Sequence, residues 1–303
     1  MKTLSYSILD TIGNTPLIRV EIEGVEVFLK LEFFNPGGSI KDRVAKAIVE
    51  KAVEKGELTK EKAVIEATSG NTGIGLALVC SALGFRCVIV MPENMSEERK
   101  KVLKALGAEL ILTPAKEGIP GAVKKVEELV RESPDKFFPA RQFENPANPE
   151  VHYRTTAVEV LSQMGKVPNL FVAGIGTGGT FTGMAKRFKE VNEKCLCIAV
   201  EPEESAVLSG KSPGPHSIQG IGAGFIPPIL DRSLIDMVKT VSFEESRYYA
   251  RLLAREFGIF CGISAGANVA AALKVARERG ISKRVVTVVP DTGERYLSTD
   301  LFS

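Results

Sequence analysis

The stretch Ala63-Val64-Ile65-Glu66-Ala67-Thr68-Ser69-Gly70-Asn71-Thr72-Gly73 indicates how this chain folds. Its first five residues form a short, mostly apolar run that is typical of a buried strand. Small polar residues follow at 68–72, and a long apolar helical pattern begins there. A strand that passes through a short turn into a helix is the repeating unit of parallel sheets.

The same alternation continues along most of the chain. Strands are expected at residues 25–31, 63–67, 87–91, 109–113, 170–173, 195–200 and 284–289. Helices are expected at residues 40–55, 72–83, 97–106, 118–131, 149–163, 181–190, 244–257 and 265–279. This pattern predicts an α/β fold with mostly parallel sheet and helices on both faces. The Pro- and Asn-rich stretch 145–149 is the best candidate for a boundary between two halves.

Composition and charge exclude several classes of protein. The 303 residues are 44% hydrophobic and 25% charged, with a net charge of +2, as in ordinary globular proteins. No basic block suggests nucleic acid or an anionic membrane. The N-terminal stretch 1–14 has no hydrophobic signal-peptide core, and the longest apolar run, 73–85, is too short to span a bilayer. A cytoplasmic protein is expected.

The cysteines and histidines predict neither disulfides nor a metal site. The five cysteines include no Cys-x-x-Cys pair, which favours free, buried thiols in a reducing compartment. They are Cys80, Cys87, Cys195, Cys197 and Cys261. With only two histidines in the chain, no metal is expected.

Three turns between a strand and a helix are rich in glycine and hydroxyl groups, as ligand loops in open sheets are. The turn 68–72 suits a carboxylate or phosphate, with plain N-capping as the alternative. In the turn 174–180, Gly174, Gly176 and Gly179 match the dinucleotide spacing Gly-x-Gly-x-x-Gly, and Glu201 follows about 20 residues on. A nicotinamide dehydrogenase is therefore one alternative. The third turn, 262–268, contains Ser264, for which N-capping of a core helix is the alternative.

Lys41 lies on the apolar side of the helix expected at 40–55. Helical spacing from Lys41 reaches Val44, Ala45, Ile48 and Ala52, whereas the solvent face is assigned to Asp42, Arg43, Lys46, Glu50 and Glu54. Burial penalises an ammonium, and a neutral lysine amine is a nucleophile suited to covalent catalysis. The alternative is a lysine that extends its charge to solvent at a helix end.

Taken together, these motifs resemble the fold-type II pyridoxal-phosphate enzymes, and within them the O-acetylserine sulfhydrylase branch. The resemblance covers essentially the whole chain. It includes the stretches 13–17, 35–43, 68–73, 142–149, 176–180, 220–227 and 293–299, together with Ser264. It implies a smaller mobile domain at 35–145 that carries the substrate-carboxylate loop. It also implies a larger domain, formed by 1–34 and 146–303, that binds the cofactor phosphate.

The resemblance also implies a role for each site residue. Lys41 would bind pyridoxal 5'-phosphate covalently and act as the base, Asn71 would bond to the ring oxygen, and Ser264 would face the ring nitrogen. The phosphate would lie in a cup formed by Gly176, Thr177, Gly178, Gly179 and Thr180. The substrate would be bound by Thr68, Ser69, Asn71, Thr72, Gln142 and Gly222.

The activity implied is cysteine synthesis from O-acetylserine and sulfide by a β-replacement. Sibling activities, cystathionine β-synthase and O-phosphoserine sulfhydrylase, remain alternatives. A site for phosphoserine is expected to contain an arginine in the long loop between Glu203 and Asp231, where Lys211 is the only lysine or arginine. The resemblance further implies a homodimer, and a serine acetyltransferase whose C-terminal tail enters the site.

Overall fold

The computed structural model describes residues 5–303, and residues 1–4 of the N-terminal stretch considered above lie outside this range. The chain forms two compact units. The first unit consists of Met1–Ile12, described from Ser5 onward, and Lys41–Asn148, while the second consists of Gly13–Ile40 and Pro149–Ser303. These bounds differ from the expected domains mainly near the N-terminus. There the backbone oxygen of Leu9 accepts a 3.0 Å hydrogen bond from Lys46 and joins this segment to the first unit.

The first unit contains a four-stranded parallel sheet in the order β5-β4-β3-β6. Its strands are β3 (Ala63–Ala67), β4 (Arg86–Pro92), β5 (Glu109–Thr113) and β6 (Phe137–Pro139). Its helices are α1 (Lys41–Glu54), α2 (Asn71–Leu83), α3 (Glu97–Ala105) and α4 (Gly118–Glu132), with 3-10 turns at Ile8–Thr11 and Ala115–Glu117.

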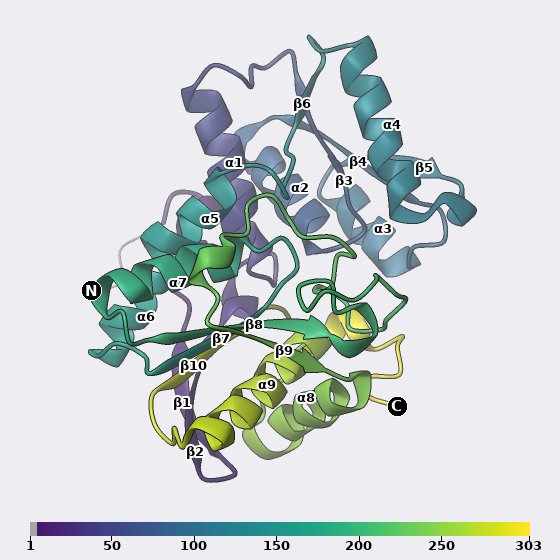
Figure 1. The fold of residues 1–303 in the computed structure, drawn as a ribbon. Coiled ribbons are helices and arrows are strands. Elements are labelled where there is room, and N and C mark those ends of the chain that lie inside the picture. Colours follow the sequence, from purple (N-terminus) through teal and green to yellow (C-terminus); the bar gives the residue numbers. More distant parts are fainter. Residues whose placement is uncertain (1–4) are drawn as a thin grey trace. The chain divides into compact units, whose positions relative to one another are not determined.

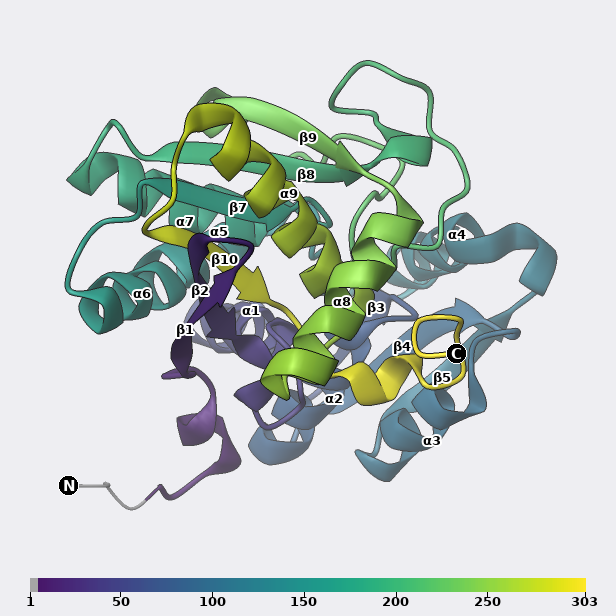
Figure 2. The same ribbon diagram turned by 90° about the horizontal axis from the view of Figure 1, so that it is seen from below.

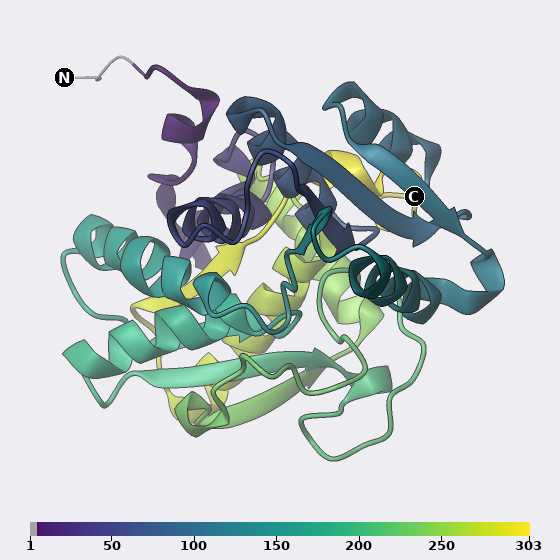
Figure 3. The ribbon, with the colours of Figure 1, turned by 90° about the horizontal axis from the view of Figure 1, so that it is seen from above.

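Helices cover both faces of this sheet, as Figures 1 and 3 show. On one face, Ala122 and Val126 of α4 pack against the alternate side chains of β3 and β4. On the other face, α2 comes close to β4, since a Cβ on Gly73 would lie 3.5 Å from Ile89. The sheet is therefore buried from both sides, which explains why its central strands are nearly continuous apolar runs.

The second unit contains a six-stranded sheet in the order β1-β2-β10-β7-β8-β9, in which only β1 and β2 pair antiparallel. Its strands are β1 (Leu17–Ile22), β2 (Val25–Leu31), β7 (Leu170–Gly174), β8 (Leu196–Pro202), β9 (Met237–Val241) and β10 (Val285–Val289). Its helices are α6 (Ala157–Met164), α7 (Gly179–Val191), α8 (Phe243–Phe257) and α9 (Ile263–Arg279). The helix α5 (Ala147–Val151) and a π-helical segment (His152–Thr156) precede α6. Short 3-10 turns lie at Glu32–Phe34, Glu203–Ser205, Arg232–Leu234 and Gly293–Tyr296.

Two apolar layers sandwich the second sheet, as Figures 1 and 2 show. The Ala-rich α9 and its neighbour α8 cover one face, which includes Leu170 and Val172 of β7. Phe171 and Ala173, the alternate residues of β7, face α6 and α7 on the other side. The layer under α8 and α9 is mainly aliphatic, whereas Phe171, Phe181 and Phe188 contribute to the layer under α6 and α7.

Every strand and helix expected from the sequence is present, and the predicted α/β class with two mostly parallel sheets is confirmed. Most ends agree within two residues, but the helix expected at 149–163 is interrupted by the π-helical segment. Three strands were not expected, namely β1, β6 and β9. All three lie at sheet edges, where half-buried, charged or very short segments carry little apolar signal. Within residues 5–303, no helix combines the length and apolarity needed to cross a bilayer.

Candidate active site

Lys41 is the first residue of α1 and is half-buried. The apolar stripe that follows it is confirmed, since Val44, Ala45, Ile48 and Ala52 are all buried. The assignment of Asp42 and Arg43 to the solvent face is wrong, because both are buried. The start of α1 lies tightly against α2, where a Cβ on Gly75 would lie 3.0 Å from the backbone oxygen of Lys41. The first turn of α1 is therefore enclosed rather than lying along the surface.

The residues just before Lys41 are anchored to the end of β10 in the second unit. The backbone amide of Ile40 donates a 2.8 Å hydrogen bond to the oxygen of Pro290, and Ser39 forms a β-bridge with Asp291. The guanidinium of Arg295 also donates to the oxygen of Gly37. The approach to the lysine is thus held by backbone contacts, which explains why a run of small residues precedes it.

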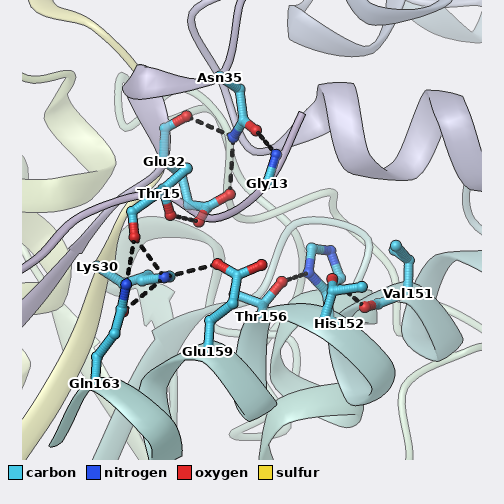
Figure 4. A network of polar contacts seen from close by, with 11 residues as sticks. Gly13, Thr15, Lys30, Glu32, Asn35, Val151, His152, Thr156, Glu159 and Gln163 are labelled. Carbon is cyan, nitrogen blue, oxygen red and sulfur yellow. Dashed lines mark hydrogen bonds and ion pairs between the residues drawn. The ribbon is translucent and has the colours of Figure 1, made fainter. Parts of the chain in front are cut away.

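Asn35, at the start of the same motif, joins two stretches of the resemblance. Its side-chain oxygen accepts a 2.8 Å hydrogen bond from the amide of Gly13 (Figure 4). Its amide nitrogen donates to the backbone oxygen and the carboxylate of Glu32 at 2.8 and 2.9 Å. The same carboxylate accepts a 2.7 Å bond from the hydroxyl of Thr15. The resemblance to the enzyme family at 13–17 therefore has a structural reason, because this segment supports the lysine motif 35–43.

A buried cation lies beneath this network (Figure 4). Lys30 of β2 is completely buried, and its ammonium lies 2.7 Å from the carboxylate of Glu159 on α6. It also donates to the backbone oxygen of Thr15 and to the side-chain oxygen of Gln163, at 2.7 and 2.9 Å. Paired in this way, Lys30 has a structural role.

The turn 68–72 connects β3 to α2 in the first unit. Gly70 is the N-cap of α2, and no side chain caps this helix. A helix N-terminus of this kind suits an anion. The hydroxyl of Thr68 instead accepts a 3.1 Å hydrogen bond from the amide of Gly70. The guanidinium of Arg99 donates to the backbone oxygen of Ser69 at 2.6 Å. The N-capping alternative for this turn is therefore not what the structure shows.

Gln142 joins this turn from a neighbouring strand. It follows β6, which pairs with β3 in parallel, so both loops leave the sheet at the same edge. The hydroxyl of Thr72 donates a 2.6 Å hydrogen bond to Oε1 of Gln142. This bond directs the oxygen of the amide toward Thr72 and leaves Nε2 as a donor for a ligand carboxylate.

In the second unit, the turn 174–180 forms a glycine-lined cradle between β7 and α7. A Cβ on Gly176 would overlap the backbone oxygen of Gly220, and one on Gly178 would lie 2.9 Å from Leu230. Gly178 is also the N-cap of α7, with φ +84° and no side-chain cap. A helix N-terminus with the hydroxyl groups of Thr177 and Thr180 beside it suits a phosphate group.

Ser264 lies in the first turn of α9 and is buried. Gly262 is the N-cap of this helix and no side chain caps it, so Ser264 does not act as a cap. The segment that includes Gly220 passes beside it, since a Cβ on Gly220 would lie 3.8 Å from the hydroxyl oxygen of Ser264. Two residues on, the amide of Gly222 donates to the backbone oxygen of Ile175 at 2.9 Å. The structure thus gathers Ser264, Gly222 and the glycine cradle in the second unit.

Asn268 connects Ser264's helix to the cradle and was missed by sequence reasoning. Its side-chain oxygen accepts a 2.7 Å hydrogen bond from the amide of Gly174, and its nitrogen donates to the oxygen of Val288 at 2.9 Å. Both of its polar ends are therefore used to hold the cradle against β10. A polar side chain within an otherwise Ala-rich buried helix was the available signal.

The dinucleotide alternative is not supported by Glu201. Its carboxylate accepts hydrogen bonds from the amide of Leu208 at 2.8 Å and from the amide and hydroxyl of Ser209 at 2.9 and 2.6 Å. Both oxygens are therefore used by the loop that follows β8, whereas a dinucleotide site would direct this carboxylate to a ribose. The first glycine also serves internal packing, since a Cβ on Gly174 would lie 2.5 Å from Ile221.

The residues present fit pyridoxal 5'-phosphate. The cradle supplies amides and hydroxyls for a phosphate, and adding a Cβ at Gly176 or Gly178 would fill it. Ser264 supplies a neutral partner for a ring nitrogen, and Lys41 supplies an amine.

Comparison with known proteins identifies close relatives over the whole chain. Residues 8–291 match the family model described as pyridoxal-phosphate dependent enzyme. A cysteine synthase of Staphylococcus aureus (strain Mu50 / ATCC 700699) is 49% identical over 302 residues, covering 98% of this chain and 97% of the relative. The crystal structure of a cysteine synthase from Entamoeba histolytica aligns with a TM-score of 0.96 and 44% identity, covering 99% of this chain and 91% of that one. An O-acetylserine dependent cystathionine beta-synthase from Helicobacter pylori aligns with a TM-score of 0.93 and 41% identity over all of both chains.

Proposed function

Because this chain belongs to the pyridoxal-phosphate dependent enzymes, we propose that it makes cysteine from O-acetylserine and sulfide. The observation that carries the proposal is the near-complete match to cysteine synthases in both sequence and structure. The two loops at the edge of the first sheet add support, because they offer the donors that an amino acid's carboxylate requires.

We assign a role toward the cofactor to each of the following residues. Lys41 would bind it covalently and Asn71 would bond to its ring oxygen. The amides and hydroxyls of 176–180 would hold its phosphate, and Ser264 would face its ring nitrogen. The bound cofactor supplies an electron sink for the electron pair left on the substrate's α-carbon.

The protein's own residues then bind and orient the substrate and accept its α-proton. The turn 68–72 and Nε2 of Gln142 bind the substrate carboxylate and orient the amino acid. The amine of Lys41 accepts the α-proton as a general base. The bond between the β-carbon and the acetate oxygen breaks, acetate leaves, and a new bond forms between sulfide and the β-carbon. Ping-pong kinetics are expected, because acetate departs before sulfide adds.

Two sibling activities are the competing candidates. A structural neighbour from Helicobacter pylori is an O-acetylserine dependent cystathionine beta-synthase, so homocysteine in place of sulfide has to be tested. O-phosphoserine is disfavoured, because Lys211 is the only lysine or arginine between Glu203 and Asp231, and its side chain is exposed.

Product analysis tests the proposal directly. The purified holoenzyme is incubated with O-acetylserine, O-phosphoserine or serine, each with sulfide or homocysteine, and the products are identified by mass spectrometry. Cysteine formed fastest from O-acetylserine and sulfide supports the proposal. Faster formation of cystathionine, or cysteine made mainly from O-phosphoserine, would replace it with the corresponding sibling activity.

The cysteines bear on the cellular location, and the resemblance bears on the partners. The five cysteines are free and buried, which suits a reducing compartment, and we propose the cytoplasm. The resemblance supports a homodimer. It also supports a serine acetyltransferase as partner, with the carboxylate of its C-terminal tail bound by the same turn as the substrate.

A further inference from the structure

Glu66 is a buried carboxylate directly beneath the loops that we assign to the substrate. It is the fourth residue of β3, one residue past the point where Ile65 pairs with Pro139 of β6. Only 7% of Glu66 is exposed. The chain turns sharply just after Pro139, so the carboxylate faces the backbone of that turn rather than another side chain.

The turn after β6 presents adjacent amide groups to this carboxylate. The amide of Gln142 donates to Oε2 of Glu66 at 3.3 Å, and the backbone of Arg141 helps to stabilise the same carboxylate. Arg141 has φ +51°, a left-handed conformation that is uncommon for residues other than glycine. Successive backbone amides around a left-handed residue form a concave site that binds anions. In this protein the carboxylate of Glu66 is the anion at that site.

Gln142 is therefore held at three points within the first unit. Glu66 binds its amide, and Asn148 donates a 2.9 Å hydrogen bond to its backbone oxygen. Thr72 donates to its side-chain oxygen at 2.6 Å. Both backbone groups and the side chain of Gln142 are thus fixed, which determines where Nε2 points.

We propose that Glu66 is a positioning residue for the substrate-carboxylate site, acting by holding the 140–142 turn so that Gln142 can bind the substrate. This inference rests on the proposed function, because it takes Gln142 as a ligand of the substrate carboxylate. Glu66 touches neither substrate nor cofactor in this role.

Burial at this position destabilises the ionised form of the Glu66 carboxylate. Burial raises the pKa of Glu66 to about 7, and the carboxylate of Glu144 adds to the rise, while the backbone hydrogen bonds oppose it. An apolar residue would avoid this cost and would fill the space next to Ile65 equally well. The amide of Gln142 would then lose its acceptor. The presence of a carboxylate at position 66 is therefore explained by the turn conformation that it holds in place.

The test compares Glu66→Gln, Gln142→Ala and the double variant as holoenzymes. Glu66→Gln keeps the shape but replaces one acceptor oxygen by a donor that faces the amides. We expect KM for O-acetylserine to rise about 5- to 20-fold, as for loss of one charge-assisted hydrogen bond, with kcat at saturation within about twofold. Gln142→Ala raises KM at least as much, and Glu66→Gln adds nothing further in that background.

A second readout is independent of activity. Hydrogen exchange of the backbone amide of Gln142 becomes faster in Glu66→Gln, because its acceptor is weakened. The matched control is Asp236→Asn in the second unit, where Oδ2 accepts a 2.7 Å hydrogen bond from the amide of Cys197. This control keeps KM for O-acetylserine unchanged.

The outcomes separate the inference from the proposed function. If Gln142→Ala raises KM but Glu66→Gln does not, the positioning role is wrong and the substrate role of Gln142 stands. The same holds if the effects of the two substitutions add fully in the double variant. If Gln142→Ala leaves KM unchanged, both fail. Should Glu66→Gln not fold, Asn148→Ala loosens the same turn from its other side, and an unchanged KM there overturns the inference.

Discussion

The side-chain oxygen of Asn268 accepts a 2.7 Å hydrogen bond from the backbone amide of Gly174, a residue 94 positions earlier in the chain. This bond fixes the start of the glycine cradle to the helix that carries Ser264. The parts that would contact the ring nitrogen and the phosphate of the cofactor are therefore linked by one buried side chain.

Replacing Asn268 by alanine is expected to weaken cofactor binding as well as stability. The amide of Gly174 and the oxygen of Val288 both lose a buried partner, which costs roughly 2–3 kcal/mol of unfolding free energy. Denaturant unfolding and titration of the apoprotein with pyridoxal phosphate measure the two effects. The control is Thr287→Val, which removes a buried 2.7 Å bond to the oxygen of Val172 but no contact to the cradle. Equal cofactor affinity in both variants would contradict the prediction.

Lys41 is expected to carry the cofactor. Borohydride reduction of the holoenzyme, proteolysis and mass spectrometry should place the pyridoxyl group on the peptide that contains Lys41. Lys30 is the internal control, because it is completely buried and paired with Glu159. A pyridoxyl group on Lys30 or on any other lysine would show that the assignment is wrong.

The stability of the protein is expected to fall as the pH rises through the range in which Glu66 titrates. Its pKa is raised by burial from about 4.5 to about 7, so the folded state binds this proton more tightly than the unfolded chain. The free energy of unfolding therefore decreases between about pH 4.5 and pH 7, by roughly 3 kcal/mol, and this contribution levels off above that range.

Glu66→Gln removes this titration. The difference in unfolding free energy between the wild type and the variant should shift in favour of the variant as the pH rises from about 5 to about 8. Urea unfolding of both proteins at several pH values measures the difference. Parallel curves over the whole range would mean that Glu66 does not titrate with a raised pKa.

The buried pair of Lys30 and Glu159 provides a separate test of stability. Lys30→Met leaves the carboxylate of Glu159 without its 2.7 Å partner and should cost about 3–5 kcal/mol. The double variant Lys30→Met, Glu159→Leu should recover much of that loss, because no uncompensated charge remains. Thermal and urea unfolding of the single and double variants measure this. A double variant less stable than the single one would show that the pair itself is strongly stabilising.

A peptide that ends in isoleucine is expected to compete with O-acetylserine. Its carboxylate would use the donors of the 68–72 turn and Gln142, and binding should perturb the cofactor's absorption spectrum. The same peptide with an amidated C-terminus is the control and should bind at least tenfold more weakly, since it lacks a charged acceptor. Equal binding to a Thr68→Ala, Gln142→Ala variant would place the peptide elsewhere.

The sequence predicts the interior of this fold better than its edges. Strands such as β2 and β3 were predicted residue by residue, because apolar runs between turn residues have few alternative structures. The edge strands β1 and β9 were not, since most of their side chains are only partly buried and charged residues interrupt their apolar runs.

For the site, residue type and local spacing predict which groups contact ligands, such as Lys41 and the glycine cradle. Residue type and local spacing do not identify the residues that support those groups. Glu66 and Gln142 are 76 residues apart in sequence, and only the pairing of β3 with β6 brings them together. The burial of Asp42 and Arg43 was missed for the same reason, because it depends on how α2 lies against the start of α1.

The chain passes from the second unit to the first between Ile40 and Lys41, and returns between Asn148 and Pro149. A recombinant chimera that exchanges whole first units between related proteins must therefore join the parental sequences immediately beside Lys41. The residues before the junction would come from one parent and the lysine from the other. Parents that differ at 35–40 should consequently give chimeras in which both units fold but the lysine is poorly placed, so an active chimera should take the motif 35–43 from a single parent.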